Sequence, residues 1–408
     1  MTLFIPKKPA RILAMAGLFL IFSPAFAAWA GLAGLSSSFG KNDAALVMNP
    51  QGQVIFSVHK DKPLVPASTL KILTALTCLH VLGETYRFPT EFYLSPENDL
   101  IVKGCGDPML VSEDLARIAA DLKALVTAKN ITLRNIVLDD TFMAQPISIP
   151  GITPNGYDPY NAPNGALCVN FNTVYFKKDP KTKAYTSAEP QTPLIPFALE
   201  RIQSAPFSHE RIVLSSKNKD NTLYAGHLLK DFLSQAHIPC TGIVRMGKAV
   251  PTRDTLEYTH LSPQPLTETV AKMLYFSNNF IANQLLISAG AAQYGAPGTL
   301  EKGISAAKAY VSDHFPDMQV TLAEGSGISR KNRISAAALM RLLQAFSPYC
   351  LLLKHHGTDY FKTGTLTGIS TRVGFILRPD GERYAYVIMM NTRGKSAQTM
   401  LDAIEAKL

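Results

Sequence analysis

The sequence predicts an α+β fold in which one domain is built from both ends of the chain and a second domain is inserted between them. Two strand-like segments and a helix occur near the N-terminus, and three strand-like segments and a helix close the chain. The stretch between them is rich in Pro, Asn and Asp, with short mixed elements. With 408 residues, 47% hydrophobic and 17% charged, the chain can bury a large core and form two domains.

The elements follow from local patterns. Residues 44–59 predict two strands around the Asn49-Pro-Gln-Gly turn, and a helix follows from Ser68. Three further strands are expected, of which the last two are joined by a Pro-Asp-Gly-Glu turn, before a final helix at 396–408; they cover residues 361–366, 371–378 and 383–391. We therefore expect a main domain formed by residues 28–88 and 255–408, with an insertion at 89–254.

The first 27 residues have the pattern of a signal peptide. Three basic residues precede an apolar run, and Pro24 breaks that run just before the small residues Ala25 to Ala27. This order predicts cleavage and export to a periplasmic or extracytoplasmic location. The alternative is a retained anchor with peripheral membrane association, because apolar character continues to Leu35, far enough to span a bilayer.

Net charge and cysteine usage limit the classes of partner and cofactor that we expect for this chain. Three residues of the signal contribute to the net charge of +9, so the mature chain carries +6; they are Lys7, Lys8 and Arg11. Because no dense basic run alternates with aromatic residues, we expect no nucleic-acid partner. The five cysteines form no Cys-x-x-Cys pair, which disfavours zinc, and their odd number leaves at least one thiol unpaired. We expect neither a metal nor a cofactor.

A buried Ser-Lys pair is the strongest signal of chemistry. The helix that opens after Pro66 is apolar on almost every face, so Lys71 is carried inside, on the same side as Ser68. A buried ammonium is costly unless it is paired or loses its proton. A neutral Lys71 could take the proton of Ser68, whose position near a helix N-terminus suits a developing oxyanion. Four other Ser-x-x-Lys pairs lie in loops, in a strand or on an exposed helix, beginning at Ser38, Ser57, Ser216 and Ser305.

Two more motifs accompany this pair. Ser277 and Asn279 present a hydroxyl and an amide two residues apart, although a helix cap would explain them equally well. Lys362 begins the strand segment Lys-Thr-Gly-Thr, which occurs once. A lysine on a strand is often an edge-protecting charge, but Gly364 would let a ligand approach the strand backbone closely.

Together and in this order, the three motifs resemble the set shared by penicillin-binding proteins and serine β-lactamases. Segments such as "GCGDPML", "YNAPNGALCVNFNTV" and "EGSGISRKNRISAAALMRLL" are similar to landmarks of the class C low-molecular-weight penicillin-binding proteins. The resemblance implies a penicillin-binding/β-lactamase-like domain, with an antiparallel five-stranded sheet and helices, and a large inserted accessory domain. The chain departs from the family pattern at Asn278, Asn283 and Glu324, where Asp, Glu and Asp are usual.

The resemblance also implies an activity. It is that of a serine D-Ala-D-Ala carboxypeptidase or DD-endopeptidase, which acts on peptidoglycan stem peptides through an acyl-enzyme and is inhibited covalently by β-lactams. Ser68 would be the nucleophile and Lys71 the general base, while Ser277 and Lys362 would relay the proton to the leaving amine. Asn279 would bind the peptide amide. Thr363 and Thr365 would hold the terminal carboxylate of the substrate, and Gly364 between them would let the substrate backbone approach the strand.

Two further residues are candidates by resemblance alone. The family's preferred substrate carries a side chain with an ammonium and a carboxylate, which Asp140 and Arg330 could receive by charge-assisted hydrogen bonds. Local bracing of loops would explain both residues equally well. A serine β-lactamase and a catalytically weak peptidoglycan-binding protein are the alternative functions. The chain is long for a β-lactamase, and no motif is damaged as a catalytically weak protein would require.

Overall fold

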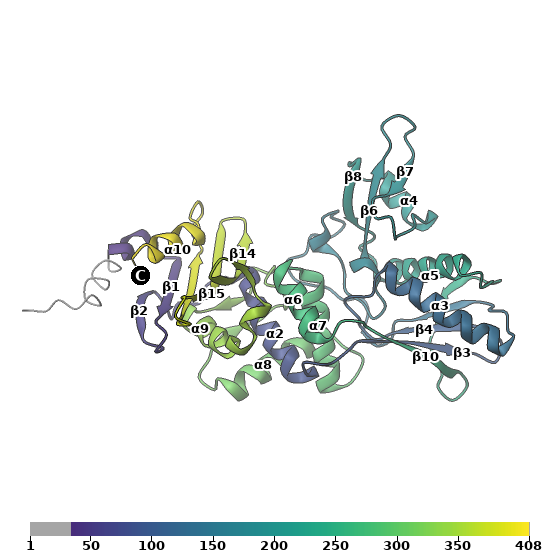
Figure 1. Ribbon diagram of the computed structural model, residues 1–408, viewed down its shortest axis with the longest axis horizontal. Helices are drawn as coiled ribbons and strands as arrows, with labels where there is room; N and C mark the ends of the chain where they lie inside the picture. Colours follow the sequence, from purple (N-terminus) through teal and green to yellow (C-terminus); the bar gives the residue numbers. More distant parts are fainter. Residues whose placement is uncertain (1–33, 408) are drawn as a thin grey trace, which may run out of the picture.

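The computed structural model describes residues 34–407 and has an elongated shape, with the two ends of the chain in one half and the middle segments in the other (Figure 1). A six-stranded sheet dominates the first half, in the order β13-β14-β15-β16-β1-β2. All of its pairings are antiparallel. Its strands are β1 (Asp43–Met48), β2 (Val54–Val58), β13 (Lys354–His356), β14 (Asp359–Leu366), β15 (Ile369–Leu377) and β16 (Arg383–Met390).

Five of these strands are the predicted ones, and the sheet joins the two ends of the chain as expected. The pairing of β1 with β16 sets Ala45 opposite Ile388. The predicted count of five is one too low, because Lys354–His356 adds a short edge strand that pairs with the start of β14. All three of its residues are exposed, so it lacks the alternating burial that made the other strands recognisable.

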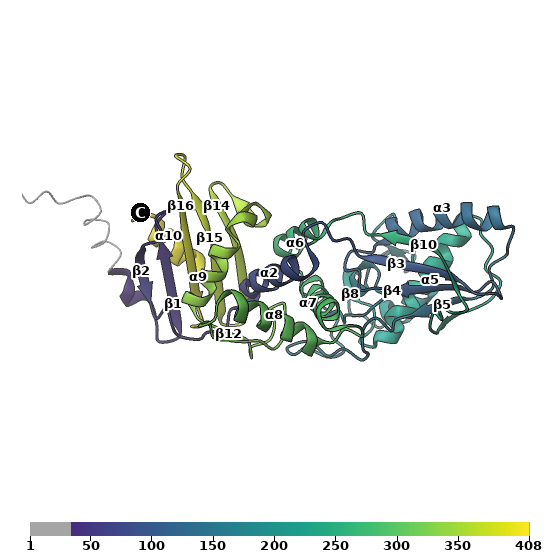
Figure 2. The same ribbon diagram turned by 90° about the horizontal axis from the view of Figure 1, so that it is seen from below.

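Helices cover both faces of this sheet. Alternate residues of β16 face opposite sides, so Ile388 packs in the cluster under α10 (Ala397–Glu405), while Val387 faces the main core. Helix α9 (Ala336–Ala345) contacts β1 and β16 on the main-core side. Figure 2 shows α2 between the sheet and the helices α6 and α7. The bounds of these three helices, and of α8, which follows α7 in the chain, are α2 (Lys71–Leu82), α6 (Leu266–Tyr275), α7 (Asn279–Tyr294) and α8 (Leu300–His314).

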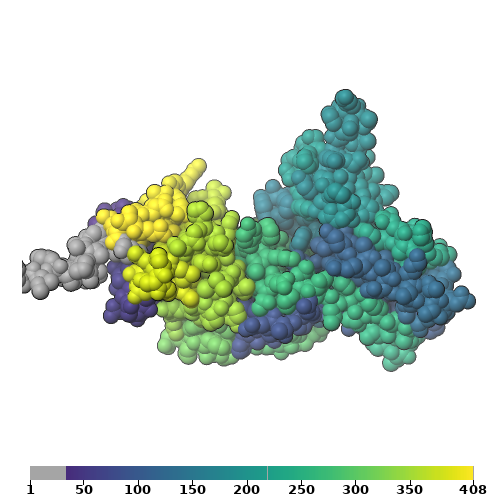
Figure 3. Space-filling model, in the orientation of Figure 1, coloured from purple at the N-terminus to yellow at the C-terminus, as the bar shows by residue number. Residues whose placement is uncertain are grey.

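The middle of the chain has its own sheets and its own core. A five-stranded sheet runs in the order β10-β3-β4-β5-β9, and a three-stranded sheet, β7-β6-β8, stands out as a separate lobe (Figures 1 and 3). The strands are β3 (Pro89–Leu94), β4 (Leu100–Gly104), β5 (Ile136–Asp139), β6 (Thr173–Lys178), β7 (Tyr185–Ser187), β8 (His209–Val213), β9 (Val244–Met246) and β10 (Thr255–Leu261). The helices of this middle part of the chain are α3 (Ser112–Lys129), α4 (Pro196–Gln203) and α5 (Asn218–Gln235).

Strand pairing places the far end of the insertion later than residue 254. Strand β10 pairs antiparallel with β3 along its length, from Thr255 opposite Leu94 to Leu261 opposite Pro89. A strand belongs to the unit whose sheet it completes, so we propose that the inserted domain runs from Pro89 to Leu261. The sequence did not signal this, because β10 is mostly exposed or half-buried.

The remaining elements are short. They include the strands β11 (Val320–Thr321) and β12 (Arg333–Ile334) and the 3₁₀ turns η1 (Gly34–Ser38), η2 (Ala67–Leu70), η3 (Pro159–Asn161), η4 (Asn170–Asn172) and η5 (Ser347–Leu352). Within residues 34–407, no helix is both long enough and apolar enough to cross a membrane. The predicted signal peptide lies outside the described residues. All five cysteines lie within them and none is in a disulfide.

Candidate active site

Ser68 lies in η2, the 3₁₀ turn that leads into α2. The turn is fixed against the sheet, because the Thr371 hydroxyl donates to the Pro66 carbonyl at 2.7 Å. Gly364 of β14 approaches it closely: a Cβ on this glycine would lie 2.7 Å from the Ser68 backbone nitrogen. Gly327 packs on the other side, where a Cβ would lie 1.9 Å from the Ala67 carbonyl oxygen. The nucleophile candidate is therefore held between two segments that require glycine.

Lys71 is fully buried and its amine points at Ser68. The Nζ atom lies 3.0 Å from Ser68 Oγ, 2.9 Å from Asn279 Oδ1 and 2.7 Å from the Ser326 carbonyl oxygen. Burial, followed by the charge of Lys362, holds the pKa of Lys71 well below its usual value, and the Glu324 carboxylate acts in the opposite direction. The expectation of a buried lysine beside Ser68 agrees with this geometry, and a neutral amine there can accept a proton.

A second Ser-Lys pair faces the same region. Lys362 is buried and donates to Ser277 Oγ at 2.9 Å and to the Thr363 carbonyl at 2.7 Å. Burial, with a smaller contribution from Lys354, lowers the pKa of Lys362 to about 7. Ser277 has a φ of 54°, in the left-handed region that non-glycine residues seldom adopt. Such a conformation at a polar residue facing a cavity is typical of functional positions.

Asn278 and Asn279 open α7 in different roles. The Asn278 side chain accepts from the Ile281 N–H at 2.9 Å and caps the helix. This cap works with Asn in place of the Asp that is usual at this position. Asn279 is the first helical residue, and its side chain reaches Lys71.

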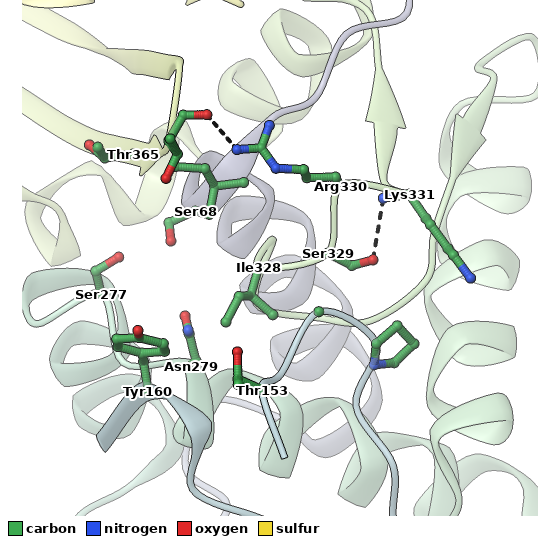
Figure 4. A pocket seen from close by; sticks show the side chains of 14 residues that line it. Ser68, Thr153, Tyr160, Ser277, Asn279, Ile328, Ser329, Arg330, Lys331 and Thr365 are labelled. Atoms are coloured by element: carbon green, nitrogen blue, oxygen red, sulfur yellow. Dashed lines mark hydrogen bonds between the residues drawn. The ribbon is translucent and has the colours of Figure 1, made fainter. Parts of the chain in front are cut away.

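The motif residues meet at one cavity of about 770 Å³, which is large enough for a peptide end (Figure 4). Ser68, Ser277, Asn279 and Thr365 line it, and the side chains of Ser68, Ser277 and Asn279 point toward a common space from different elements. Arg330 lies on another wall and donates to the Thr367 carbonyl. The inserted domain completes the lining with residues that sequence reasoning missed, namely Pro150, Gly151, Thr153 and Tyr160.

Besides Lys71 and Lys362, which are buried, three predicted site residues lie outside this lining. Gly364 is beneath it, against Ser68, and Thr363 is exposed on β14. Asp140 is half-buried just after β5, where burial raises its pKa. The structure brings Arg330 to the cavity but does not bring Asp140 to its wall. In the part of the chain that is described, no cluster of three or more His, Cys, Asp or Glu side chains is arranged to hold a metal ion.

Glu324 organises the loop that supplies a carbonyl to Lys71. Its carboxylate is buried and accepts from the backbone N–H groups of Ser326 and Gly327, at 2.7 and 2.8 Å. It also accepts from the Asn332 amide at 2.7 Å. The loop is thereby fixed so that the Ser326 carbonyl faces Lys71. The sequence contained the signal in the landmark "EGSGISR", but nothing in it showed that a backbone oxygen would be the contact.

The comparison with known protein families decides to which family the chain belongs. Residues 38–349, well over half of the chain, match the D-Ala-D-Ala carboxypeptidase 3 (S13) family. The chain belongs to this family. The predicted enzyme class, a serine D-Ala-D-Ala carboxypeptidase, and the predicted relationship to low-molecular-weight penicillin-binding proteins are therefore confirmed.

Individual S13 relatives are distant but span most of the chain. The D-alanyl-D-alanine carboxypeptidase of Actinomadura sp. (strain R39) is 24% identical over 88% of this chain and 79% of its own length. The carboxypeptidase DacB of Haemophilus influenzae is 24% identical over 84% and 83%. The crystal structure of penicillin binding protein 4 (dacB) from Haemophilus influenzae superposes with a TM-score of 0.74, 22% identity, and coverage of 92% of this chain and 97% of that one. The penicillin-binding fold, insertion included, is thus shared.

Proposed function

We propose that this S13 enzyme cleaves the terminal D-Ala-D-Ala bond of peptidoglycan stem peptides with Ser68 as nucleophile and Lys71 as general base. The observation that carries the proposal is the pair of Ser-Lys contacts beside a single cavity. Lys71 lies 3.0 Å from Ser68 and is buried, with no carboxylate within ion-pair distance among the described residues. An amine in this setting favours the neutral form that a base requires.

The acylation step uses both pairs. Ser68 Oγ attacks the carbonyl carbon between the two D-alanines while its proton passes to Lys71 Nζ. The C–N bond then breaks, and the departing amine takes a proton through Ser277, whose hydroxyl is held by Lys362 at 2.9 Å. Backbone N–H groups of Ser68 and Thr365 are the candidate donors to the oxyanion. Water then attacks the ester, releases the shortened peptide and restores Ser68.

Strand β14 is suited to hold the substrate backbone. On one side it pairs with β15 along its whole length, whereas on the other side β13 covers only residues 359–361. On that side no strand of residues 34–407 pairs with residues 362–366, so an extended peptide can add there as a strand, close to Ser68. Thr365 on this edge, with Arg330 across the cavity, supplies groups for the terminal carboxylate.

The product pattern tests the activity and its alternatives. We expect purified protein to release D-alanine from a pentapeptide stem, or to split cross-linked stem dimers, with loss of both reactions in Ser68→Ala. Release of D-alanine alone would identify a carboxypeptidase, and cleavage of dimers would add DD-endopeptidase activity. Rapid turnover of β-lactams without peptide cleavage would favour a β-lactamase, and binding of peptidoglycan without either reaction would favour a wall-binding protein.

We further propose that the protein is exported and works in the periplasm or another extracytoplasmic space. The support is the order of basic, apolar and small residues in the first 27 positions, together with the location of peptidoglycan. N-terminal sequencing of the exported protein should find a start close to residue 28. A retained Met1 in the membrane fraction would instead favour the anchored, membrane-associated form.

A further inference from the structure

Helix α7 contacts two different parts of the molecule, each through a pair of residues four positions apart. Asn279 and Asn283 face the catalytic residues: Asn279 Oδ1 accepts from Lys71 at 2.9 Å, and Asn283 Oδ1 accepts from the Gly325 N–H at 2.8 Å. Phe280 and Gln284 face the inserted domain instead. The helix that carries Asn279 is therefore fixed from both sides of the molecule.

The contacts of Gln284 with the inserted domain are unusually complete. Its side chain is 0% exposed. Gln284 Nε2 donates to the Gly165 carbonyl at 2.6 Å and to the Gly106 carbonyl at 3.1 Å, while Oε1 accepts from Asn164 Nδ2 at 3.0 Å. The same Asn164 amide donates to the Phe280 carbonyl at 2.9 Å. One buried amide thus joins α7 to two separate segments of the insertion.

The segments that hold Gln284 are themselves rigidly packed. The Gly106 N–H donates to the Ala166 carbonyl at 2.8 Å, and a Cβ on Gly104 would lie 2.3 Å from the same oxygen. Phe171 lies in the turn η4, three consecutive residues with positive φ, and its ring meets that of Phe280 edge-on with centroids 6.2 Å apart. The helix is therefore held against backbone and a fixed ring.

We propose that Gln284 is a positioning residue through which the inserted domain sets the place of Asn279 beside Lys71. The inference rests on the proposed function, in which Asn279 and Lys71 act at the cavity. Gln284 itself neither lines the cavity nor contacts Lys71. Its effect is transmitted along the first turns of α7, because a small shift of this helix is enough to break a 2.9 Å contact.

A purely structural role for Gln284 makes a different prediction. If Gln284 only stabilises the fold, its loss lowers the melting temperature and leaves the chemistry of the folded protein unchanged. If it positions Asn279, its loss removes an acceptor from the Lys71 ammonium, which disfavours the charged form. The acid limb of the acylation pH profile then moves to lower pH, while the plateau rate falls. Lys362 and Glu324, the other charged groups that act on Lys71, are the same in the variant.

The test is the acylation rate of Gln284→Met by a fluorescent penicillin across pH 5 to 9, with Ile287→Val as the matched control. Met has a similar length but no hydrogen-bonding amide, and Ile287 is a buried residue of the same helix. We expect the rate at which the penicillin acylates Gln284→Met to fall by about 10- to 100-fold, and the acid limb of the pH profile to be displaced to lower pH. The control should keep the wild-type rate within about 2-fold and the wild-type limb, because no polar contact changes.

A second variant approaches the same contact from the inserted domain. Asn164→Ala removes the donor to both Phe280 and Gln284, and it should displace the limb in the same direction. If the folded fractions of both variants are acylated with the wild-type rate and pH profile, the inference is overturned, even when their melting temperatures drop. Failure of the wild-type protein itself to be acylated would instead reject the proposed function.

Discussion

Replacing Lys71 by arginine separates a general base from a structural charge. The lysine amine is fully buried and lies within 3.0 Å of three oxygen atoms, one of which is Ser68 Oγ. An arginine keeps the positive charge but does not deprotonate in proteins, so it cannot accept the serine proton. General-base catalysis is typically worth ~10²–10⁴-fold, which corresponds to about 3–5 kcal/mol in the acylation barrier. We expect Lys71→Arg to lose acylation by this amount.

Two further variants complete this experiment. Lys71→Met fits the site without the bulk of a guanidinium, so equally slow Met and Arg variants would assign the loss to the missing base rather than to crowding. Lys362→Arg should be milder, because Lys362 acts on Lys71 through its charge and holds Ser277 as a donor. The assay is the rate at which a fluorescent penicillin labels the protein, with folding checked by thermal melting.

The outcomes of this set are distinct. An active Lys71→Arg would refute the reasoning, because the buried lysine would then be structural and the base would lie elsewhere. Equally slow Lys71→Arg and Lys362→Arg variants would make Lys362 a direct partner in proton transfer rather than a tuning charge.

Two other predictions follow from the same site. Lys362 holds its proton up to about pH 10.5 in the unfolded chain but only to about 7 in the fold, so unfolding binds a proton between these values and stability should rise with pH across this window. Chemical denaturation at pH 7 and 10 should show a smaller rise for Lys362→Met, with a difference of at most about 4 kcal/mol, which is the limit over three pH units at 1.36 kcal/mol each; an equal rise in the two proteins would contradict the lowered pKa of Lys362 in the fold. Gly364→Ala should lose at least ~10²-fold in acylation, because its Cβ would lie 2.4 Å from Thr371 Oγ1 and 2.7 Å from the Ser68 nitrogen; stopped-flow acylation at the wild-type rate would show that β14 can yield.

Local patterns in the sequence were sufficient for most of the main domain. Alternating apolar residues marked β1, β2 and β14 to β16, and the apolar helix after Pro66 revealed that Lys71 is buried. The edge strand β13 was missed because it is three residues long and wholly exposed. Our proposal that the insertion ends at Leu261 and not at residue 254 depends on the pairing of β10 with β3, which is a long-range contact that local patterns do not show.

The site itself was only partly readable. The resemblance to a known family named Ser68, Lys71, Ser277, Asn279 and Lys362, although Lys71 and Asn279 are 208 positions apart in the chain. Spacing alone could not have joined them. The carbonyl of Ser326 and the buried amide of Gln284 carry no sequence signature, because the same residues are common in ordinary loops and helices. Backbone acceptors and buried amides are recognised only once the fold brings their partners together.

Every step proposed for this enzyme depends on Ser68 forming the acyl-enzyme. Incubation with a labelled penicillin, followed by digestion and mass spectrometry, tests it most directly, because the labelled peptide identifies the residue and the time course reports the ester's lifetime. We expect a long-lived ester on the peptide that contains Ser68, and none in Ser68→Ala. Labelling that persists in Ser68→Ala, or that appears at Ser38, Ser57, Ser216 or Ser305, would contradict it.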